Sequence, residues 1–308
     1  MKYRMLGGSG LRISEIGLGC MSIPAVDVDA GMRIIHRAID LGINYIDTAD
    51  IYDKGLNETL VGNALKGKRE SVVLATKVGN QWKNDGSGLK WNPHKEHIIS
   101  AVEKSLQRLQ TDYIDVYQLH GGTIEDPIDE TIEAFELLVR EGKIRHYGIS
   151  SIRPNVIREY VKRSNIMSVM MQYSLADRRP EEEMLELLEK NNIGVLARGS
   201  LAQGMLTGKA AKQYLGHSAD SIANAAAVVH KLSNESGASN PFSKKRTAAQ
   251  TAIRYALQHS AVVSAIVGVS RLEQLDEIAA TSDIEPLNIQ EHRLLESSVT
   301  ALKYIEHR

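Results

Sequence analysis

Four polar side chains that could together deliver a proton follow short apolar runs of this sequence. Asp47, Tyr52, Lys77 and His120 provide a carboxylate, a phenol, an ammonium and an imidazole. A tyrosine ordinarily loses its proton near pH ~10, but a neighbouring cation lowers the pKa of the phenol. A phenol in that setting can act as a general acid close to neutral pH. If folding brings the four side chains together, the sequence predicts acid catalysis with Tyr52 as the proton donor.

Apolar, β-branched runs alternate with amphipathic stretches along the chain, which indicates strands alternating with helices. The expected strands are Glu15–Leu18, Ile43–Ile46, Val72–Thr76, Tyr113–Leu119, Arg145–Ile149, Val169–Met171, Gly194–Ala197 and Val262–Val267. The expected helices include Ala30–Leu41, Glu58–Lys66, His97–Leu109, Asp129–Glu141, Pro154–Arg163, Pro180–Asn191 and Lys244–Gln258. Eight such repeats indicate parallel strands joined by right-handed crossovers into a closed (β/α)8 TIM barrel. We therefore predict an α/β protein in which residues 1–308 form a single barrel domain.

An open, doubly wound sheet is the structural alternative, and the first strand argues against it. Such a sheet would be expected to carry Gly-x-Gly-x-x-Gly directly after its first strand. Here Gly17-Leu18-Gly19-Cys20-Met21 has no third glycine at the right place. The glycine cluster at residues 7–10 is not followed by a helical pattern. We predict that it turns an N-terminal β-hairpin, with strands Tyr3–Leu6 and Leu11–Ile13, rather than forming a phosphate-binding loop.

Three segments depart from the regular alternation. Gly79–Pro93 and Gln203–Phe242 are longer than a connection needs, and we expect long βα loops at the C-terminal rim of the barrel. The second of them is expected to contain a helix around residues 221–232. Gln290–His307 has helical apolar spacing. We expect this last segment to be a helix that packs on the barrel exterior or partly covers its mouth.

Active sites of such barrels lie at the C-terminal ends of the strands, and chemically useful residues stand at these positions here. They are Gly19-Cys20-Met21, Asp47, Lys77, His120, Ser150-Ser151, Gln172-Tyr173, Arg198 and Gly268–Ser270. Each alone has an ordinary structural explanation, such as a helix cap or a solvated strand end. Together, at successive strand ends, they favour a functional site. A metal site at His94 and His97 is disfavoured because no third ligand stands nearby.

The composition is that of an ordinary globular protein. The chain has 308 residues, of which 24% are charged and 43% hydrophobic, and its net charge is −1. Neither nucleic acid nor an anionic membrane is indicated as a partner by that balance. A single cysteine, Cys20, excludes an intramolecular disulfide and suits a reducing compartment. With no apolar run long enough to span a membrane, we expect a cytoplasmic protein.

Several motifs resemble the aldo-keto reductase superfamily. The matching stretches are residues 43–52 (Ile-Asn-Tyr-Ile-Asp-Thr-Ala-Asp-Ile-Tyr), 74–77, 105–109, 113–120, 142–145, 147–150 and 268–277. They follow one another over almost the whole chain, which makes the likeness specific. The chain looks most like the bacterial members of the type that includes general stress and inositol-operon reductases, and less like the mammalian aldose reductases.

This resemblance implies an NADPH-dependent carbonyl reductase without a metal. By that likeness Tyr52 is the general acid, Asp47 and Lys77 lower its pKa, and His120 orients the carbonyl. Hydride would pass from the nicotinamide to the carbonyl carbon. The residues that the likeness assigns to binding of NADPH or NADP+ are Gly19, Cys20, Met21, Asp47, Ser150, Ser151, Gln172, Arg198, Gly199, Leu201, Gln203, Lys209, Gly268, Ser270, Arg271, Gln274 and Glu277.

Within that set the likeness suggests distinct tasks. Ser150 and Gln172 match residues that hold the nicotinamide carboxamide, and Lys209 matches one that reaches the cofactor phosphates. The adenosine end would meet the segment from Ser270 to Glu277, where Arg271 could face a 2′-phosphate. The chain departs from the family pattern at three positions, Ser151, Arg198 and Ile278. Arg198 stands where an aromatic ring commonly stacks on the nicotinamide, and we expect its planar guanidinium to cover that ring or to meet an anionic substrate group.

Two other functions stay open at this point. A regulatory protein on the same fold could use the bound nucleotide as a sensor with little turnover, and alcohol oxidation with NAD is the third reading. We expect a small carbonyl substrate in an aromatic-lined pocket that includes Trp82 and Trp91. Aldehydes, α-dicarbonyls and aromatic aldehydes all suit such a pocket. The likeness favours a monomer or a weak homo-oligomer.

Overall fold

A computed structural model describes residues 1–23, 25–83, 85–236 and 245–308 of the chain. In these residues eight parallel strands close into a barrel, so the predicted (β/α)8 fold is confirmed. The barrel strands are β3 (Ile16–Gly19), β4 (Tyr45–Asp47), β5 (Val73–Val78), β8 (Ile114–Leu119), β9 (Ile144–Ser150), β10 (Ser168–Gln172), β11 (Gly194–Arg198) and β12 (Val262–Gly268). Each lies beside the previous barrel strand of the sequence, and β12 closes the ring against β3. All eight predicted strands are present, with small differences at their ends.

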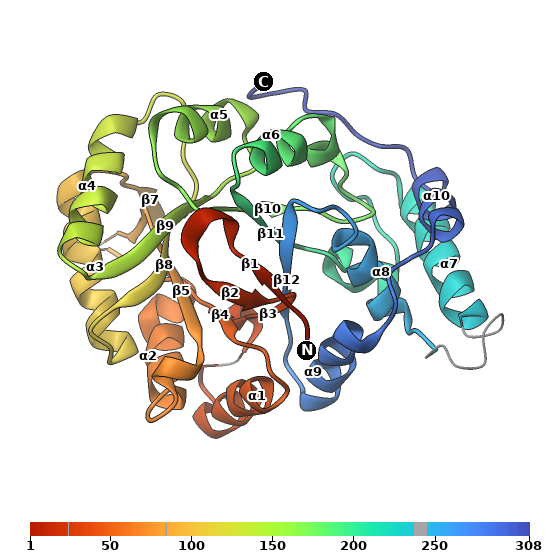
Figure 1. The fold of residues 1–308 in the computed structure, drawn as a ribbon, viewed down its shortest axis with the longest axis horizontal. Helices are drawn as coiled ribbons and strands as arrows, with labels where there is room; N and C mark the ends of the chain where they lie inside the picture. The colour runs from red at the N-terminus through yellow and green to blue at the C-terminus, as the bar shows by residue number, and fades with distance from the viewer. Residues whose placement is uncertain (24, 84, 237–244) are drawn as a thin grey trace.

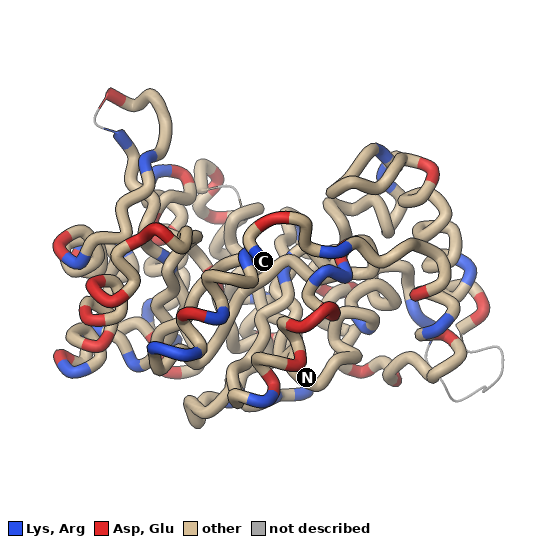
Figure 2. Tube along the Cα trace, turned by 90° about the horizontal axis from the view of Figure 1, so that it is seen from above, with Lys and Arg blue, Asp and Glu red and all other residues tan. Residues whose placement is uncertain are grey.

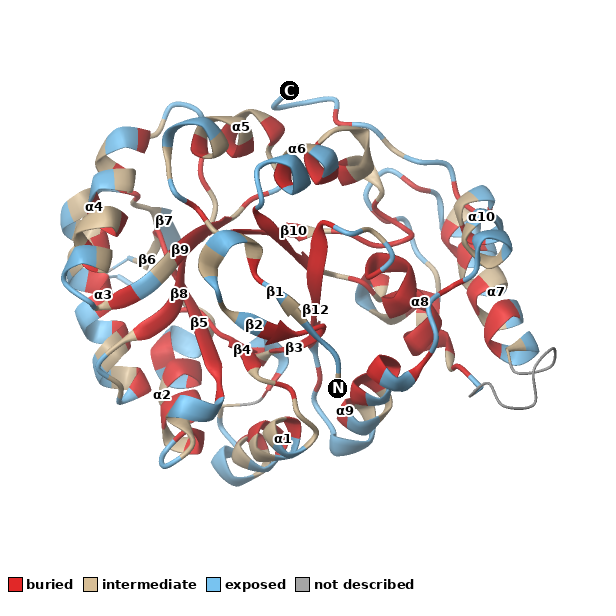
Figure 3. Ribbon diagram, in the orientation of Figure 1, coloured by how far each residue is buried: buried red, intermediate tan, exposed pale blue. Residues whose placement is uncertain are grey.

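Helices surround the barrel on its outside (Figure 1). Those described are α1 (Val28–Asp40), α2 (Leu56–Ala64), α3 (Lys95–Leu109), α4 (Ile128–Arg140), α5 (Pro154–Arg163), α6 (Met184–Lys190), α7 (Ala219–Glu235), α8 (Ala248–Ala256), α9 (Leu272–Ala279) and α10 (Ile289–Ser297). The strands are buried along almost their whole length, whereas the helices bury one face and expose the other (Figure 3). The main core therefore lies between the barrel wall and the helix ring.

A second, smaller core fills the inside of the barrel. Tyr45, Val116, Met170 and Leu196 are among the side chains that pack there. The N-terminal hairpin, β1 (Tyr3–Met5) paired with β2 (Arg12–Ser14), adds apolar side chains to this cluster and closes one end of the barrel (Figure 1). The predicted hairpin is thus confirmed. Because it covers one end, the opposite end is left for binding.

The first long segment is more ordered than the predicted loop. Residues Asn80–Trp82 and Leu89–Trp91 pair as the antiparallel strands β6 and β7. Gly86 and Gly88, both with positive φ, stand at the turn, where glycine adopts this geometry without strain. The hairpin projects beyond the barrel on one side (Figure 2). The polar and glycine-rich composition of residues 83–88 hid the two short strands on either side of it.

The second long segment contains the expected helix, which extends further than predicted. Helix α7 begins at Ala219, where the side chain of Ser218 accepts a hydrogen bond from the Ser221 N–H, and it ends at Glu235. Residues 237–244 lie outside the described part of the chain, and with them the predicted end of this loop and the first residue of the helix predicted from Lys244. That next helix, α8, begins at Ala248 behind a capping box of Thr247 and Gln250.

Two of the predicted helices differ from the structure in extent. The stretch 180–191 divides into a 3-10 turn, η5 (Arg179–Glu182), and the short α6, with non-helical backbone at Glu183. The C-terminal helix predicted to reach His307 ends at Ser297. Two serines and a β-branched pair follow one another at residues 297–300, all weak helix formers, and the Ser297 and Ser298 hydroxyls bond to carbonyls of the last turn. The tail beyond has no helical residues and contacts α5 and η5, where the Tyr304 N–H donates to Glu182.

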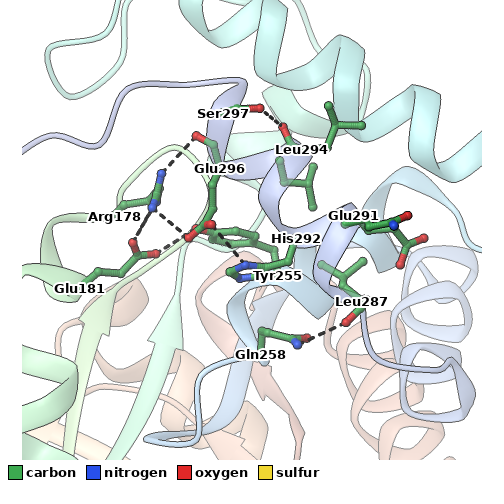
Figure 4. Close-up of polar contacts among 12 residues, drawn as sticks. Arg178, Glu181, Tyr255, Gln258, Leu287, Glu291, His292, Leu294, Glu296 and Ser297 are labelled. Atoms are coloured by element: carbon green, nitrogen blue, oxygen red, sulfur yellow. Dashed lines mark hydrogen bonds and ion pairs between the residues drawn. The ribbon is translucent and has the colours of Figure 1, made fainter.

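A partly buried polar cluster fastens α10 to the barrel, and we call it the α10 clasp (Arg178, Glu181, Tyr255 and Glu296; Figure 4). Arg178 lies 2.8 Å from Glu181 and 3.1 Å from Glu296. Glu181 also accepts hydrogen bonds from the hydroxyls of Tyr255, at 2.9 Å, and Tyr173, at 3.0 Å. Each charge in the clasp therefore meets an opposite charge or a hydroxyl donor.

The surface carries acidic and basic residues interspersed over the chain (Figure 2), in keeping with the near-zero net charge. None of the helices in the described ranges has the length and apolar character needed to cross a lipid bilayer.

Candidate active site

A cavity of about 1000 Å³ opens at the end of the barrel opposite the N-terminal hairpin. All four residues of the expected proton-delivery set, Asp47, Tyr52, Lys77 and His120, line it. Strand alternation explains three of these positions, because residues two apart point to the same side of a strand. Asp47 stands two residues after Tyr45, and Lys77 stands two residues after Ala75, and both Tyr45 and Ala75 face the inside of the barrel. On the next strand His120 stands two residues after Gln118. The chain thus stacks a polar layer on top of the apolar barrel interior.

Lys77 is the centre of this polar layer. Its Nζ lies 2.6 Å from Asp47 Oδ2, 2.7 Å from the Thr48 carbonyl oxygen and 3.4 Å from the Tyr52 hydroxyl. An ammonium group has three N–H donors, so each of them has one acceptor here. Gln118 donates a further hydrogen bond to the other oxygen of Asp47, at 3.3 Å. The carboxylate and the ammonium are both buried, which fixes the geometry of the pair.

Tyr52 is held by a tight turn rather than by a strand. It begins the 3-10 turn η3 (Tyr52–Gly55), in which Asp53 and Lys54 adopt positive φ angles of 47° and 55°. Such angles cost energy in residues other than glycine. Its ring lies edge-on to that of His120, with the centroids 6.0 Å apart. The turn therefore directs the phenol at the same point as Lys77 and His120.

The protonation of this set differs in one respect from the sequence-based expectation. Burial raises the pKa of Tyr52 above its usual value; Lys77 lowers that pKa and Asp47 raises it. The predicted lowering is therefore wrong, because desolvation of the phenolate outweighs the cation and Asp47 opposes it. The phenol keeps its proton at neutral pH. Burial also acts to lower the pKa of Lys77, but Asp47 and Tyr52 outweigh it and raise that pKa, so the group remains an ammonium.

His120 is neutral in this environment. Burial lowers its pKa to about 3, and the positive charges of Lys77 and Arg198 act in the same direction. Its Nδ1 atom is buried and has no hydrogen-bond partner within the described structure. A neutral imidazole carries one N–H donor and one acceptor nitrogen, so His120 can donate a hydrogen bond to an oxygen without bringing a charge.

Most residues assigned to the cofactor by resemblance also line the cavity. They are Gly19, Met21, Asp47, Ser150, Ser151, Gln172, Arg198, Gly199, Leu201, Gln203 and Gly268. Others do not line it: Cys20 is a fully buried core thiol, and Lys209 is exposed beside Gly204. Ser270, Arg271, Gln274 and Glu277 lie on or just before α9, outside the cavity wall. Of the two tryptophans, Trp91 lines the cavity. Trp82 is not part of the lining and donates to the carbonyl of Ile51, a lining residue.

These residues fit a nicotinamide dinucleotide in their chemistry. Ser150, Ser151 and Gln172 offer hydroxyl and amide groups on neighbouring strand ends, which suit a carboxamide. The Ser200 hydroxyl is buried without a partner in the described part of the chain and is thus available to a ligand. Gly19 and Gly268 are register partners on adjacent strands. A side chain on Gly268 would come within 2.6 Å of the Ser22 hydroxyl, so a larger residue there would require Ser22 to move.

Sequence reasoning missed several cavity or supporting residues, of which three bear on the chemistry. Gln118 is the second donor to Asp47, and its place two residues before His120 could have indicated that role. Arg153 lines the cavity three residues after the end of β9, just past the stretch that we considered a strand end. Tyr214 accepts a hydrogen bond from the Gln172 amide at 2.8 Å, and no local pattern in the sequence pointed to it.

A metal centre finds no support in the described residues. No group of three or more His, Cys, Asp or Glu side chains there is arranged to hold an ion. His94 lies 3.2 Å from Glu130, at the start of α3.

Comparison with known proteins finds relatives over most or all of the chain. The family model described as "Aldo/keto reductase family" matches residues 15–300. The uncharacterized oxidoreductase YqkF of Bacillus subtilis (strain 168) is 48% identical over 317 residues, covering 100% of both chains. The NADH-specific methylglyoxal reductase of Escherichia coli (strain K12) is 38% identical over 234 residues, which are 70% of this chain and 72% of that protein.

Solved structures agree over the whole length. Aldo-keto reductase AKR11C1 from Bacillus halodurans, in its holo form, superposes with a TM-score of 0.89 at 47% identity, covering 100% of this chain and 99% of that one. An aldo/keto reductase from Klebsiella pneumoniae in complex with NADP and acetate gives a TM-score of 0.78 at 29% identity, covering 99% and 98%.

Proposed function

The chain belongs to the aldo/keto reductase family, and from that premise we propose that it reduces aldehydes or ketones to alcohols with NADPH, Tyr52 acting as the general acid. The observation that carries the proposal is the hydrogen bonding of Lys77. Two of its N–H groups are taken by Asp47 and Thr48, and the third is directed at the Tyr52 oxygen. That donor stabilises the phenolate that forms when Tyr52 gives its proton away.

The raised pKa of Tyr52 suits this role. A phenol that stays protonated at neutral pH holds the proton that a developing alkoxide requires. Neutral His120, beside the Tyr52 ring, donates a hydrogen bond to the same carbonyl oxygen and orients it. The carbonyl oxygen thus receives its proton from Tyr52, while the carbonyl carbon faces the cofactor side of the cavity. Bound NADPH would supply the hydride.

We assign the cofactor to the part of the cavity that Gly19, Gly268 and the ends of β9 and β10 line. Ser150, Ser151 and Gln172 would hold the carboxamide, and Gly19 with Gly268 would let the backbone approach it closely. NADPH is favoured over NADH because Lys209 and Arg271 are exposed cations without a carboxylate partner in the described structure, near the expected phosphates. The Klebsiella pneumoniae neighbour holds NADP, whereas the Escherichia coli relative is NADH-specific. The test must therefore compare NADPH with NADH.

A single buried cysteine suits a cytoplasmic setting, and we expect a monomer or a weak homo-oligomer.

The test compares the natural chain with Tyr52→Phe on an aromatic aldehyde. We expect NADPH oxidation to fall by about 10²- to 10⁴-fold in the variant, the usual contribution of a positioned acid. Cofactor affinity, measured by quenching of the tryptophan fluorescence, should be retained. Faster turnover with NADH than with NADPH would reject the cofactor assignment. NADPH binding without turnover of any aldehyde in a panel would favour a nucleotide sensor over an enzyme.

A further inference from the structure

Two arginines of this protein differ from all the others that are buried or partly buried in the described residues. Each of the others, from Arg4 beside Glu15 to Arg254 beside the same carboxylate, lies within 4.0 Å of a carboxylate oxygen. Arg153 and Arg198 have no such partner in the described part of the chain. A partly desolvated cation without a counter-ion is costly unless something else balances it. These two are therefore candidates for binding an anion that the chain itself does not supply.

Both exceptions line the same cavity. The lining contains one carboxylate, Asp47, and Lys77 already neutralises it. Asp126 lies behind the wall, where the Thr123 N–H and the Trp91 indole donate to it. It is not within ion-pair distance of Arg153. The cavity therefore has an excess of two positive charges, which attracts an anionic ligand.

The two guanidinium groups belong to different segments of the cavity lining. Arg198 ends β11 and donates to Gln172 at 3.1 Å, so it lies on the side that we assign to the nicotinamide. Arg153 follows β9 and reaches Gly122 in the segment that follows β8. It donates from Nη1 to the Gly122 carbonyl, and its backbone N–H donates to the Ser151 hydroxyl. Because the likeness assigns Arg198 and not Arg153 to the cofactor, Arg153 is the arginine that we consider for the substrate.

Arg153 is also held in a fixed place. A guanidinium has five N–H donors, and the described structure gives only the Gly122 carbonyl as an acceptor for them. The remaining donors can form the paired hydrogen bonds that carboxylate and phosphate groups accept. Gly122 is two residues after His120, which limits their Cα separation to about 7 Å. An anion on Arg153 would thus sit roughly one aromatic ring away from the carbonyl oxygen beside His120.

We propose that the substrate of this enzyme is a carbonyl compound that carries a carboxylate or phosphate group, and that Arg153 binds this group while the carbonyl oxygen lies between Tyr52 and His120. The proposal rests on the proposed reductase function and adds the substrate class. It makes Arg153 a specificity-determining residue, because an uncharged aldehyde leaves the guanidinium without its anion. The uncharged substrate is then bound less well.

The test uses 4-carboxybenzaldehyde against its neutral methyl ester, and glyceraldehyde 3-phosphate against glyceraldehyde. The variant is Arg153→Gln, which keeps an N–H donor for Gly122 but loses the charge. We expect kcat/KM for the charged member of a pair to fall about 10- to 100-fold, mainly through KM, as for a lost hydrogen bond to a charged group. The neutral member should change less than about threefold. Whichever pair responds distinguishes carboxylate from phosphate recognition.

Two controls separate this idea from its rivals. Arg140→Gln removes an exposed arginine at the end of α4 and should leave all four substrates unaffected. Arg153→Lys should restore part of the preference for the charged substrate. An equal loss on charged and neutral substrates would give Arg153 a structural role and overturn the proposal. A parallel loss of NADPH affinity would assign Arg153 to the cofactor and overturn it as well.

A binding measurement keeps the proposal testable without turnover. Terephthalate, which has no carbonyl to reduce, should bind the NADPH-saturated protein in calorimetry, and Arg153→Gln should weaken that binding at least tenfold. Binding that is unchanged in the variant would overturn the inference even if the enzyme is an active reductase. Conversely, weakened binding with no turnover of any aldehyde would refute the reductase function and leave the anion site standing.

Discussion

The α10 clasp and the cavity both contain charged groups that are at least partly buried, but the partners of these groups differ. In the clasp Glu181 accepts from Arg178 and two tyrosine hydroxyls, and Arg178 reaches a second carboxylate on Glu296. In the cavity two arginines have no carboxylate, and the His120 Nδ1 and Ser200 hydroxyl are buried without partners in the described structure. The comparison suggests that polar groups with a structural role have hydrogen-bond or ion-pair partners within the chain, whereas polar groups of a binding site find their partners in a ligand.

The Asp47–Lys77 pair stands between these two extremes. Like the clasp, it is fully hydrogen bonded within the chain, and it is more deeply buried than the clasp. Like the cavity, it turns one donor toward a group that must change its protonation, Tyr52. Structural and catalytic roles of one pair can be separated only by changing its members singly and together.

The largest effect is expected when Lys77 is replaced by Met. Removing one member of a buried ion pair leaves the other uncompensated, which typically costs about 3–5 kcal/mol. Activity should fall at least as far as in Tyr52→Phe, because the phenolate loses its stabilising donor. Urea denaturation and kcat/KM on an aromatic aldehyde measure the two losses separately.

A double variant, Asp47→Asn with Lys77→Met, decides between the two roles. It removes both charges, so the free energy of unfolding should recover most of the loss. Activity should stay as low as in the single variant. Recovered activity would mean that Lys77 serves only to neutralise Asp47, and that Tyr52 needs no cation.

In the clasp, Glu181→Gln should lower the stability of the protein and leave its activity unchanged. The amide keeps the shape but loses the charge that Arg178 and the two tyrosine hydroxyls share, so we expect a loss of about 2 kcal/mol in the free energy of unfolding. Turnover of the folded enzyme should be unchanged, because α10 lies outside the cavity wall.

Glu186→Gln is the matched control for that variant. Glu186 forms an exposed pair with Lys190 on α6, and water screens such a pair, so its loss should barely change the free energy of unfolding. A clasp variant that lost no more stability than this control would remove the distinction between the two regions. A clasp variant that lost activity would show coupling between α10 and the site.

The sequence predicted the barrel because its strands are short, apolar and separated by amphipathic helices. The polar layer was predictable from the positions of the strands. Asp47, Lys77 and His120 stand at the ends of three successive strands, and Tyr52 stands about one turn after Asp47. By contrast, the β6–β7 hairpin and Arg153 lie in connections, where no periodicity marks which side chains turn inward. The length of α10 was overestimated because apolar spacing continues past the residues that end the helix.

The lowered pKa of Tyr52 was the one chemical expectation that failed. Neighbouring charges can be inferred from the order of residues, since Asp47 and Lys77 stand on adjacent strands. The degree of burial of Tyr52 cannot be inferred in this way. It depends on separate segments that form the walls of the cavity, among them β6, β7 and the loop from Gly199 to Gly204. Desolvation then decided the direction of the shift.

The smallest expected effect concerns His120 and the pH dependence of stability. Its folded-state pKa of about 3 lies below the value of an unfolded histidine, near ~6.5. Between these values the unfolded chain binds more protons, so stability is fully present above pH ~6.5 and is lost as the pH falls. For this group alone, the loss between pH 8 and pH 6 amounts to about 0.8 kcal/mol by linkage. His120→Gln should remove that loss, measured as the difference between the two urea titrations. An unchanged pH dependence in the variant would mean that the imidazole ionises freely in the folded state, and that its buried nitrogen has access to water.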